Sequence, residues 1–258
     1  MNQVIKKEEG ALAVNMFEAD ADKGSQNMTQ DDLALPFLKV LGQLSPEVNK
    51  VHSRYVKDAE PGMIINSVTN ELYDGTKGID ILPVFYERKV IEWQDRGAGA
   101  GAPVAIHDAS SDIMSQTTRD KSYKDRLPNG NYIEETASYY VLIESKSGTS
   151  GAYTPALITM KSTQLQVSKK WNSMMKTIQI ADGKGGFAIP PMHGVVYNLQ
   201  SVLQKNDKGS WYGWVVTQDR IMGQADKNLY LSAKDFNGSV SKGNVQTKAD
   251  VEEKAKDN

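Results

Sequence analysis

Residues 79–93, IDILPVFYERKVIEW, carry the longest strand signal in the chain, and the rest of the fold is deduced outward from them. The stretch is rich in β-branched and aromatic residues, which favour an extended backbone. Side chains alternate between the two faces of a strand, so this pattern predicts Val84, Tyr86, Arg88 and Val90 on one face. We therefore expect a long strand that presents an aromatic ring beside a guanidinium group.

Further elements follow along the chain. Val167, Trp171, Met174 and Ile178 recur at helical spacing and predict an apolar stripe on a helix. A short run, NDKG, has the composition of a tight hairpin turn. The expected elements are strands at residues 138–144 and 155–160, a helix at about 162–178, strands at 194–203 and 210–219, and a helix at about 225–240.

The body of the chain thus has the order strand, strand, strand, helix, strand, strand. This order is that of an OB-fold, a five-stranded Greek-key barrel with a helix between its third and fourth strands. Other β-rich folds can produce the same order. The predicted class is mainly β with helices (α+β), namely an OB-fold-like five-stranded barrel followed by a C-terminal helix.

The chain is expected to contain one folded domain between two flexible ends. Residues 1–30 form an acidic disordered arm, since residues 1–32 hold three lysines and seven acids. A single domain spans residues 31–243 and contains a long loop at 94–136, and residues 244–258 form a flexible tail.

The start of that domain is apolar. Residues 31–44, DDLALPFLKVLGQL, are expected to pack, with Asp31 or Asp32 available to cap a short helix. Short extended pieces, HSRYV and GMIINSV, are expected between residues 51 and 76.

Composition excludes several classes of protein. The chain has 258 residues, a net charge of −2 and no cysteine, so disulfides, thiolate zinc sites, iron–sulfur clusters and cysteine nucleophiles are absent. No apolar run approaches the ~20 residues of a membrane helix. The acids near the N-terminus are atypical of a signal peptide. We expect a cytoplasmic protein that does not contact membranes.

Motifs for catalysis are also missing. The glycine-rich run RGAGAGAP at residues 96–103 is not followed by Gly-Lys-Ser/Thr, so it is not a phosphate-binding loop. The three histidines are isolated from one another, and no nucleophile elbow or zinc-protease motif occurs. We expect no enzyme, no cofactor and no metal. The alternative is a nuclease or recombination factor with a metal-bound loop around His107, Asp108 and Asp112.

What the sequence does offer is cations interleaved with aromatic rings, the combination that binds unpaired nucleic acid. Lysines occur without a single acid between Glu144 and Asp182. Tyr139 and Tyr140 are adjacent on a strand, so one of them should point away from the core. Tryptophans in a chain with four are more often core residues. The candidate nucleic-acid-binding residues are Tyr86, Arg88, Trp93, Arg96, Lys121, Tyr123, Lys124, Arg126, Tyr139, Lys161, Lys169, Lys170, Trp171 and Lys176.

Four blocks of sequence resemble a group of bacteriophage single-stranded DNA-binding proteins. They are DLALPFLKVLGQLSPEV (32–48), LPNGNYIEETASYYVLI (127–143), PALITMKSTQLQVSKKWNSMMK (155–176) and NDKGSWYGWVV (206–216). The resemblance implies an OB-fold protein that coats single-stranded DNA during phage replication or recombination, in the host cytoplasm. Replication or recombination proteins are then expected partners, and a homo-oligomer is an open alternative.

One feature departs from that group. Its members commonly end in a strongly acidic tail, whereas VEEKAKDN is mixed in charge and carries no aromatic residue. Recruitment of a polymerase through this tail is therefore in doubt. The competing prediction is a phage structural or assembly protein with no nucleic-acid role, whose arms and loops contact neighbouring subunits.

Overall fold

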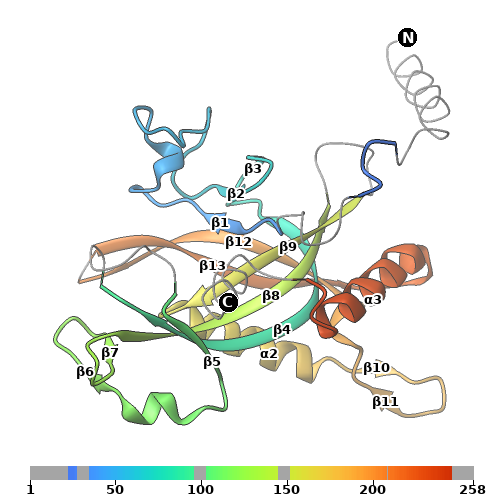
Figure 1. Cartoon of the computed structure of the whole chain (residues 1–258). Coiled ribbons are helices and arrows are strands. Elements are labelled where there is room, and N and C mark those ends of the chain that lie inside the picture. Colours follow the sequence, from blue (N-terminus) through green and yellow to red (C-terminus); the bar gives the residue numbers. More distant parts are fainter. Residues whose placement is uncertain (1–22, 28–34, 96–102, 145–151, 208, 246–258) are drawn as a thin grey trace. The chain divides into compact units, whose positions relative to one another are not determined.

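The computed structural model describes residues 23–27, 35–95, 103–144, 152–207 and 209–245 (Figure 1). The chain divides into two compact units. In the first, residues 1–33, the described part is a turn at residues 23–27. The second, residues 34–258, contains all the helices and strands discussed below. The expected arm at 1–30 and the tail at 244–258 lie almost wholly outside the described residues.

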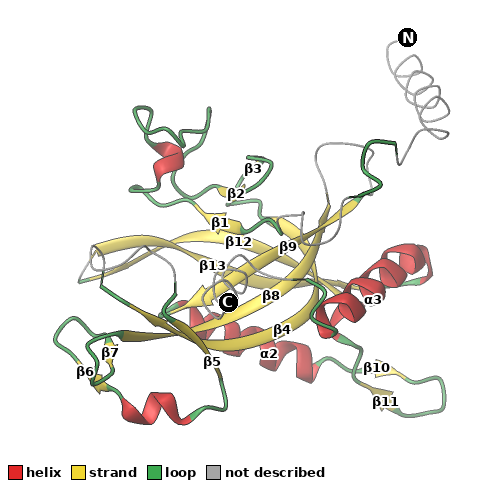
Figure 2. Cartoon of the chain, viewed as in Figure 1, coloured by secondary structure: helices red, strands yellow, loops and turns green. Residues whose placement is uncertain are grey.

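Antiparallel strands of the second unit build a strongly curved main sheet (Figure 2). Its neighbours run in the order β13-β12-β4-β8, and β9 pairs with the other edge of β8. The sheet curls into a half barrel rather than lying flat (Figure 1). Its long strands are β4 (Ile79–Trp93), β8 (Tyr132–Glu144), β9 (Tyr153–Lys161), β12 (Val195–Asn206) and β13 (Gly209–Ile221).

Two helices cover the two faces of this sheet. α2 (Gln164–Thr177) contacts β8, β9 and β13, and α3 (Lys227–Ser241) contacts β4. Both helices and four of the five long strands were predicted within a few residues of their observed bounds, and β8 was predicted with its end but not its start. The order of these elements is also the predicted one.

Alternation along the strands separates the core into two layers. Ile81 and Tyr197 are buried on the face that packs against α2, together with Trp171. The neighbouring Leu82 and Val196 belong to a different cluster, which packs against α3. A sheet with both faces covered has little room for exposed side chains along its centre.

A β-bulge in β4 changes the predicted face of one residue. The pairing of β4 with β8 shifts register between Pro83 and Phe85, which leaves Val84 as the extra residue. Val84 therefore packs with the α3 cluster, while Tyr86 packs against the α2 cluster. The prediction that these two side chains share a face was wrong, because a bulge resets the alternation.

The segment predicted as a long loop at 94–136 contains regular structure. β5 (Ala105–Asp108) pairs with the end of β4, and β8 begins at Tyr132 rather than at residue 138. Between them lie η4 (Asp112–Gln116) and a short hairpin of β6 (Thr118–Arg119) and β7 (Asp125–Arg126). These strands are only two to four residues long, too short for the hydrophobic alternation that reveals a strand.

The apolar segment near the start of the domain forms a strand, not a helix. β1 (Leu38–Val40) pairs with β2 (Ile64–Asn66), which pairs with β3 (Leu72–Tyr73). Pro36 precedes β1, and its carbonyl oxygen accepts a hydrogen bond of 2.8 Å from the amide of Leu157 in β9. Asp31 and Asp32, the predicted caps, lie outside the described residues. The HSRYV piece forms turns, next to the short helix η3 (Pro46–Val48).

The remaining elements follow α2 and precede α3. β10 (Ile180–Ala181) and β11 (Phe187–Ala188) form a small hairpin, and η5 (Met192–Gly194) leads into β12. η6 (Gln224–Asp226) leads into α3.

The architecture is a mainly β protein of the α+β class. Closure into a barrel is not confirmed: within the described part of the chain, β9 and β13 do not pair with each other. β1 contacts both of these strands and lies at the open side. No helix of the described residues is long and apolar enough to cross a bilayer.

Candidate nucleic-acid interface

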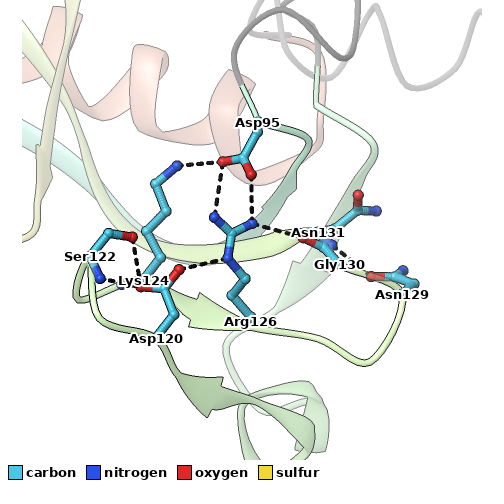
Figure 3. A network of polar contacts seen from close by, with 8 residues as sticks. All are labelled: Asp95, Asp120, Ser122, Lys124, Arg126, Asn129, Gly130 and Asn131. Carbon is cyan, nitrogen blue, oxygen red and sulfur yellow. Dashed lines mark hydrogen bonds and ion pairs between the residues drawn. The ribbon is translucent and has the colours of Figure 1, made fainter.

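Two predicted phosphate-binding cations near the β6–β7 hairpin are held by carboxylates instead (Figure 3). Lys124 Nζ lies 2.7 Å from Asp95 Oδ1. Arg126 bridges two acids, with Nη1 2.9 Å from Asp95 Oδ2 and Nε 2.7 Å from Asp120 Oδ2. Lys124 also lies over the ring of Tyr132, 4.0 Å from its centroid. These contacts hold the hairpin against the end of the main sheet.

Two further candidates are paired across strands of the sheet. The guanidinium group of Arg88 on β4 donates to the carboxylate of Glu135 on β8. Lys161 at the end of β9 lies 2.8 Å from Glu134 Oε2. Like the hairpin cations, these side chains would have to give up a carboxylate before they could bind a phosphate.

Asp120 organises the hairpin turn. Its carboxylate accepts hydrogen bonds from the Ser122 hydroxyl, the backbone amide of Lys124 and the guanidinium group of Arg126. These donors hold the pKa of Asp120 well below its usual range. Arg126 and Lys124 lower the pKa of Asp95 in the same way.

Acid is therefore expected to loosen the β6–β7 hairpin selectively. A depressed folded-state pKa gives stabilisation that is complete above the unfolded-state value, near 3.8 for Asp120, and that is lost as the pH falls towards the folded-state value. The protection factor of the Lys124 amide in hydrogen exchange should fall between about pH 5 and pH 2. An Asp120→Asn variant should have low protection already at pH 7, with little further change in acid. The same pH profile in both proteins would contradict the role of Asp120.

The two candidate rings nearest α2 are core residues. Tyr139 and Trp171 are both 0% exposed, and their rings stack with centroids 4.1 Å apart. The hydroxyl of Tyr139 lies 2.7 Å from Ser168 Oγ and 2.9 Å from Asn172 Oδ1, and burial raises its pKa. Neither ring is accessible to a base, so neither is a stacking residue. Tyr140, on the other face of β8, is also buried, at 2% exposed.

The other candidates have varied surroundings. Tyr86 is half-buried and lines a cavity beside Lys176, and Trp93 is half-buried at the end of β4. Lys121 and Tyr123 are exposed in the hairpin turn. Arg96 lies outside the described residues.

The lysines of α2 differ from Arg88, Lys124, Arg126 and Lys161, which are paired with carboxylates. Lys169, Lys170 and Lys176 are exposed, and none of them forms an ion pair with an acid in the described part of the chain. No acidic residue occurs between Glu144 and Asp182, so no acid of this segment can pair with them. The opposite side of α2, which includes Trp171, is buried, so the lysines share the solvent side. We call these three residues the α2 lysines.

One exposed aromatic residue was missed at the sequence level. Phe187 on β11 is 74% exposed. It follows a turn shaped by Asp182, whose Oδ1 accepts the amide of Lys184 at 2.7 Å and that of Gly186 at 2.9 Å. The available signal was an aromatic residue directly after the turn sequence ADGKGG, in a segment directly after the acid-free lysines.

The alternative enzymatic hypothesis involves His107, Asp108 and Asp112. His107 and Asp108 lie on β5, and Asp112 is the first residue of η4. His107 Nε2 lies 3.2 Å from Glu92 Oε2 on β4, rather than against Asp108. Burial alone would raise the pKa of Glu92, but hydrogen bonds from Asn131, Asn129 and His107 lower it. Among the described residues, no group of three or more histidines and acids is placed to hold a metal ion.

Fold and surface together define a mainly β protein of the α+β class with a cationic helix on its curved sheet. A family model described as Pam3 phage gp34-like protein matches residues 6–246, and the chain belongs to this family. The match supports a phage protein. No curated protein and no solved structure is significantly similar to the chain.

Proposed function

We propose that this protein binds single-stranded DNA without sequence preference during phage DNA replication or recombination. The α2 lysines bind phosphates of the strand, and two accessible rings contact bases: Tyr86, which shares a cavity with Lys176, and the exposed Phe187. In this proposal the protein acts in the host cytoplasm, with replication or recombination proteins as its partners. The phage family and the cationic helix support it.

The observation that carries the proposal is the contrast between two sets of lysines and arginines. Arg88, Lys124, Arg126 and Lys161 are neutralised by neighbouring carboxylates. The α2 lysines have no such partner among the described residues. Unpaired surface cations on one helix side favour a polyanion, because binding releases the counterions that the phosphates condense.

The spacing on α2 suits an extended chain of phosphates. Lys169 and Lys176 are seven residues apart, a rise of about 10 Å along the helix. Lys170 lies on the flank towards Trp214 of β13, and Lys176 lies on the flank towards Tyr86 of β4. A strand crossing the helix would thus meet cations on both of its flanks.

The same proposal includes a more specific assignment of the fold. We infer an OB-fold-like barrel left open between β9 and β13, with α2 inserted after the third long strand. The order of the long elements and the pairing of β4 with both β8 and β12 support this. OB-folds bind oligonucleotides on the surface of such a sheet.

The test is fluorescence anisotropy of a labelled 30-mer, as a single strand and as a duplex, at two salt concentrations. We expect tight binding of the single strand that weakens with salt, and much weaker binding of the duplex. Absence of single-strand binding at low salt would overturn the proposal.

A specific observation also favours the second candidate function, a phage structural or assembly protein. Leu44 and Val51, in the loop between β1 and β2, are 98% and 92% exposed. In an assembly protein, side chains of this kind would be covered by a neighbouring subunit. Sedimentation without DNA distinguishes the two candidates, because an assembly protein should oligomerise as its concentration rises.

A further inference from the structure

A cavity of about 590 Å³ lies beside the C-terminal half of α2. Its walls come from β4, α2, α3 and the segment at residues 189–193 that follows the β10–β11 hairpin. This volume lies within the range of small-molecule sites. Of the candidate nucleic-acid-binding residues, Tyr86 and Lys176 line it.

The walls are suited to a flat, mostly apolar group. Tyr86 offers a ring, and Met175, Ile189, Pro190 and Pro191 offer apolar surface. Bases taken out of a stack are held between aromatic and apolar side chains of this kind.

Two side-chain amides, those of Asn172 and Asn237, contribute to the polar part of the lining, and each is already fixed by the protein. Asn172 accepts a 2.9 Å hydrogen bond at Oδ1 from the hydroxyl of Tyr139. Asn237 donates from Nδ2 to the carbonyl oxygen of Val84, at 2.7 Å. These bonds fix the two amides and use one acceptor site of Asn172 Oδ1 and one N–H group of Asn237 Nδ2. Each amide therefore keeps further donor and acceptor capacity for a ligand.

Amides can pair with any nucleobase. The Watson–Crick edge of adenine, cytosine, guanine and thymine carries at least one donor and one acceptor, so amide groups that can both donate and accept do not select among them. A site of this kind is therefore compatible with binding that tolerates any sequence.

Charge at the cavity favours an anionic ligand. Lys176 lines it and is exposed, and no carboxylate is found among the described residues of the lining. His193, which also lines it, has its pKa lowered by burial and by the nearby Lys234 ammonium group, so it is neutral at pH 7.

We propose that this cavity receives one unpaired base of the bound strand, stacked on Tyr86, with its edge on Asn172 and Asn237 and its phosphate at Lys176. This inference rests on the proposed single-strand binding and adds to it a defined place for one base. It predicts that binding depends on bases as well as on phosphates.

The test compares a 30-mer single strand with an abasic phosphodiester of the same length. Methyl-¹³C methionine spectra of the protein should show saturable shifts at Met175 and Met192 with the base-bearing strand only. Ile189→Trp narrows the cavity mouth at a residue that is 53% exposed. It should weaken binding about 5- to 150-fold, the contribution of one stacked base. The matched control is Leu231→Trp on α3, a residue 46% exposed, which should bind like the parent protein.

The outcomes separate the two proposals. Tight binding of the 30-mer with unmoved Met175 and Met192 signals, or with unchanged affinity of Ile189→Trp, overturns the base site and leaves single-strand binding standing. Failure of the 30-mer to bind in the anisotropy assay overturns both. Base-dependent shifts together with weaker binding of Ile189→Trp support both.

Discussion

Replacing Lys169, Lys170 and Lys176 together with glutamate is expected to weaken single-strand binding by at least about 100-fold at 0.1 M salt. Each single-strand phosphate contact contributes about 0.7 to the slope of log affinity against log salt. Three lost contacts should therefore lower that slope by about 2, which corresponds to the stated loss at this salt concentration. The measurement is anisotropy titration of the 30-mer over a range of salt concentrations.

The structure provides a matched control for this variant. Lys50, Lys57 and Lys242 are also exposed lysines, away from α2, and their replacement with glutamate changes the net charge by the same amount. This control should bind nearly as the parent protein does. Both variants should unfold within about 1 kcal/mol of the parent, because all six side chains are on the surface. Equal losses of binding in the two variants would show that net charge, not the α2 lysines, governs affinity.

Trp171→Ala is expected to lower the free energy of unfolding by about 3–5 kcal/mol. Trp171 is 0% exposed, stacks on Tyr139, and meets the ring of Tyr197 edge-on at 5.6 Å between centroids. Its removal opens a cavity where α2 meets the sheet, and the rings around it cannot all move in to fill the space. Urea unfolding followed by far-ultraviolet circular dichroism measures the change.

Two further variants test whether lost packing of the buried ring causes this decrease in the free energy of unfolding. Trp171→Phe should cost clearly less than Trp171→Ala, since the indole N–H has no hydrogen-bond partner among the described residues and most of the ring volume is kept. Phe187→Ala removes a ring that is 74% exposed and should change stability by no more than about 0.5 kcal/mol. A loss below about 1 kcal/mol for Trp171→Ala would contradict the packing described for α2.

The long elements were predictable because each carries its own periodic pattern. β4 was predicted with its observed bounds, and α2 was predicted from the apolar stripe that includes Trp171. The hairpin joining β12 and β13 was indicated by its turn residues. Such signals are local, so they need no knowledge of which elements meet.

The face that a side chain occupies and its exposure to solvent were harder to predict, because both depend on the elements that cover the sheet. Adjacent tyrosines on β8 suggested that one ring points to solvent, yet Tyr139 packs under α2 and Tyr140 packs near Phe236 of α3. Alternation separates the two faces but does not show that both are buried. The bulge at Val84 added a further shift that composition does not reveal.

The ion pairs near the candidate site could not be predicted either, because they join residues that are far apart in sequence. Arg126 and Asp95 are 31 residues apart in sequence, and Arg88 and Glu135 are 47 apart. Only the pairing of β4, β7 and β8 brings these charges together. The α2 lysines were recognisable because the absence of nearby acids in sequence persisted in space.

The pairing of β4 with β12 has a consequence for synthesis of the protein. Asp80 on β4 and Asn198 on β12 meet across 118 positions of sequence. At about 5–20 residues per second, a ribosome needs roughly 6–24 s to make that interval. During this time residues 79–81 of β4, the part of the strand that pairs with β12, have no native neighbour on that side and can join edges of other chains. The yield of folded protein is therefore expected to depend on how fast that late strand arrives, and to rise when fewer chains are made at once.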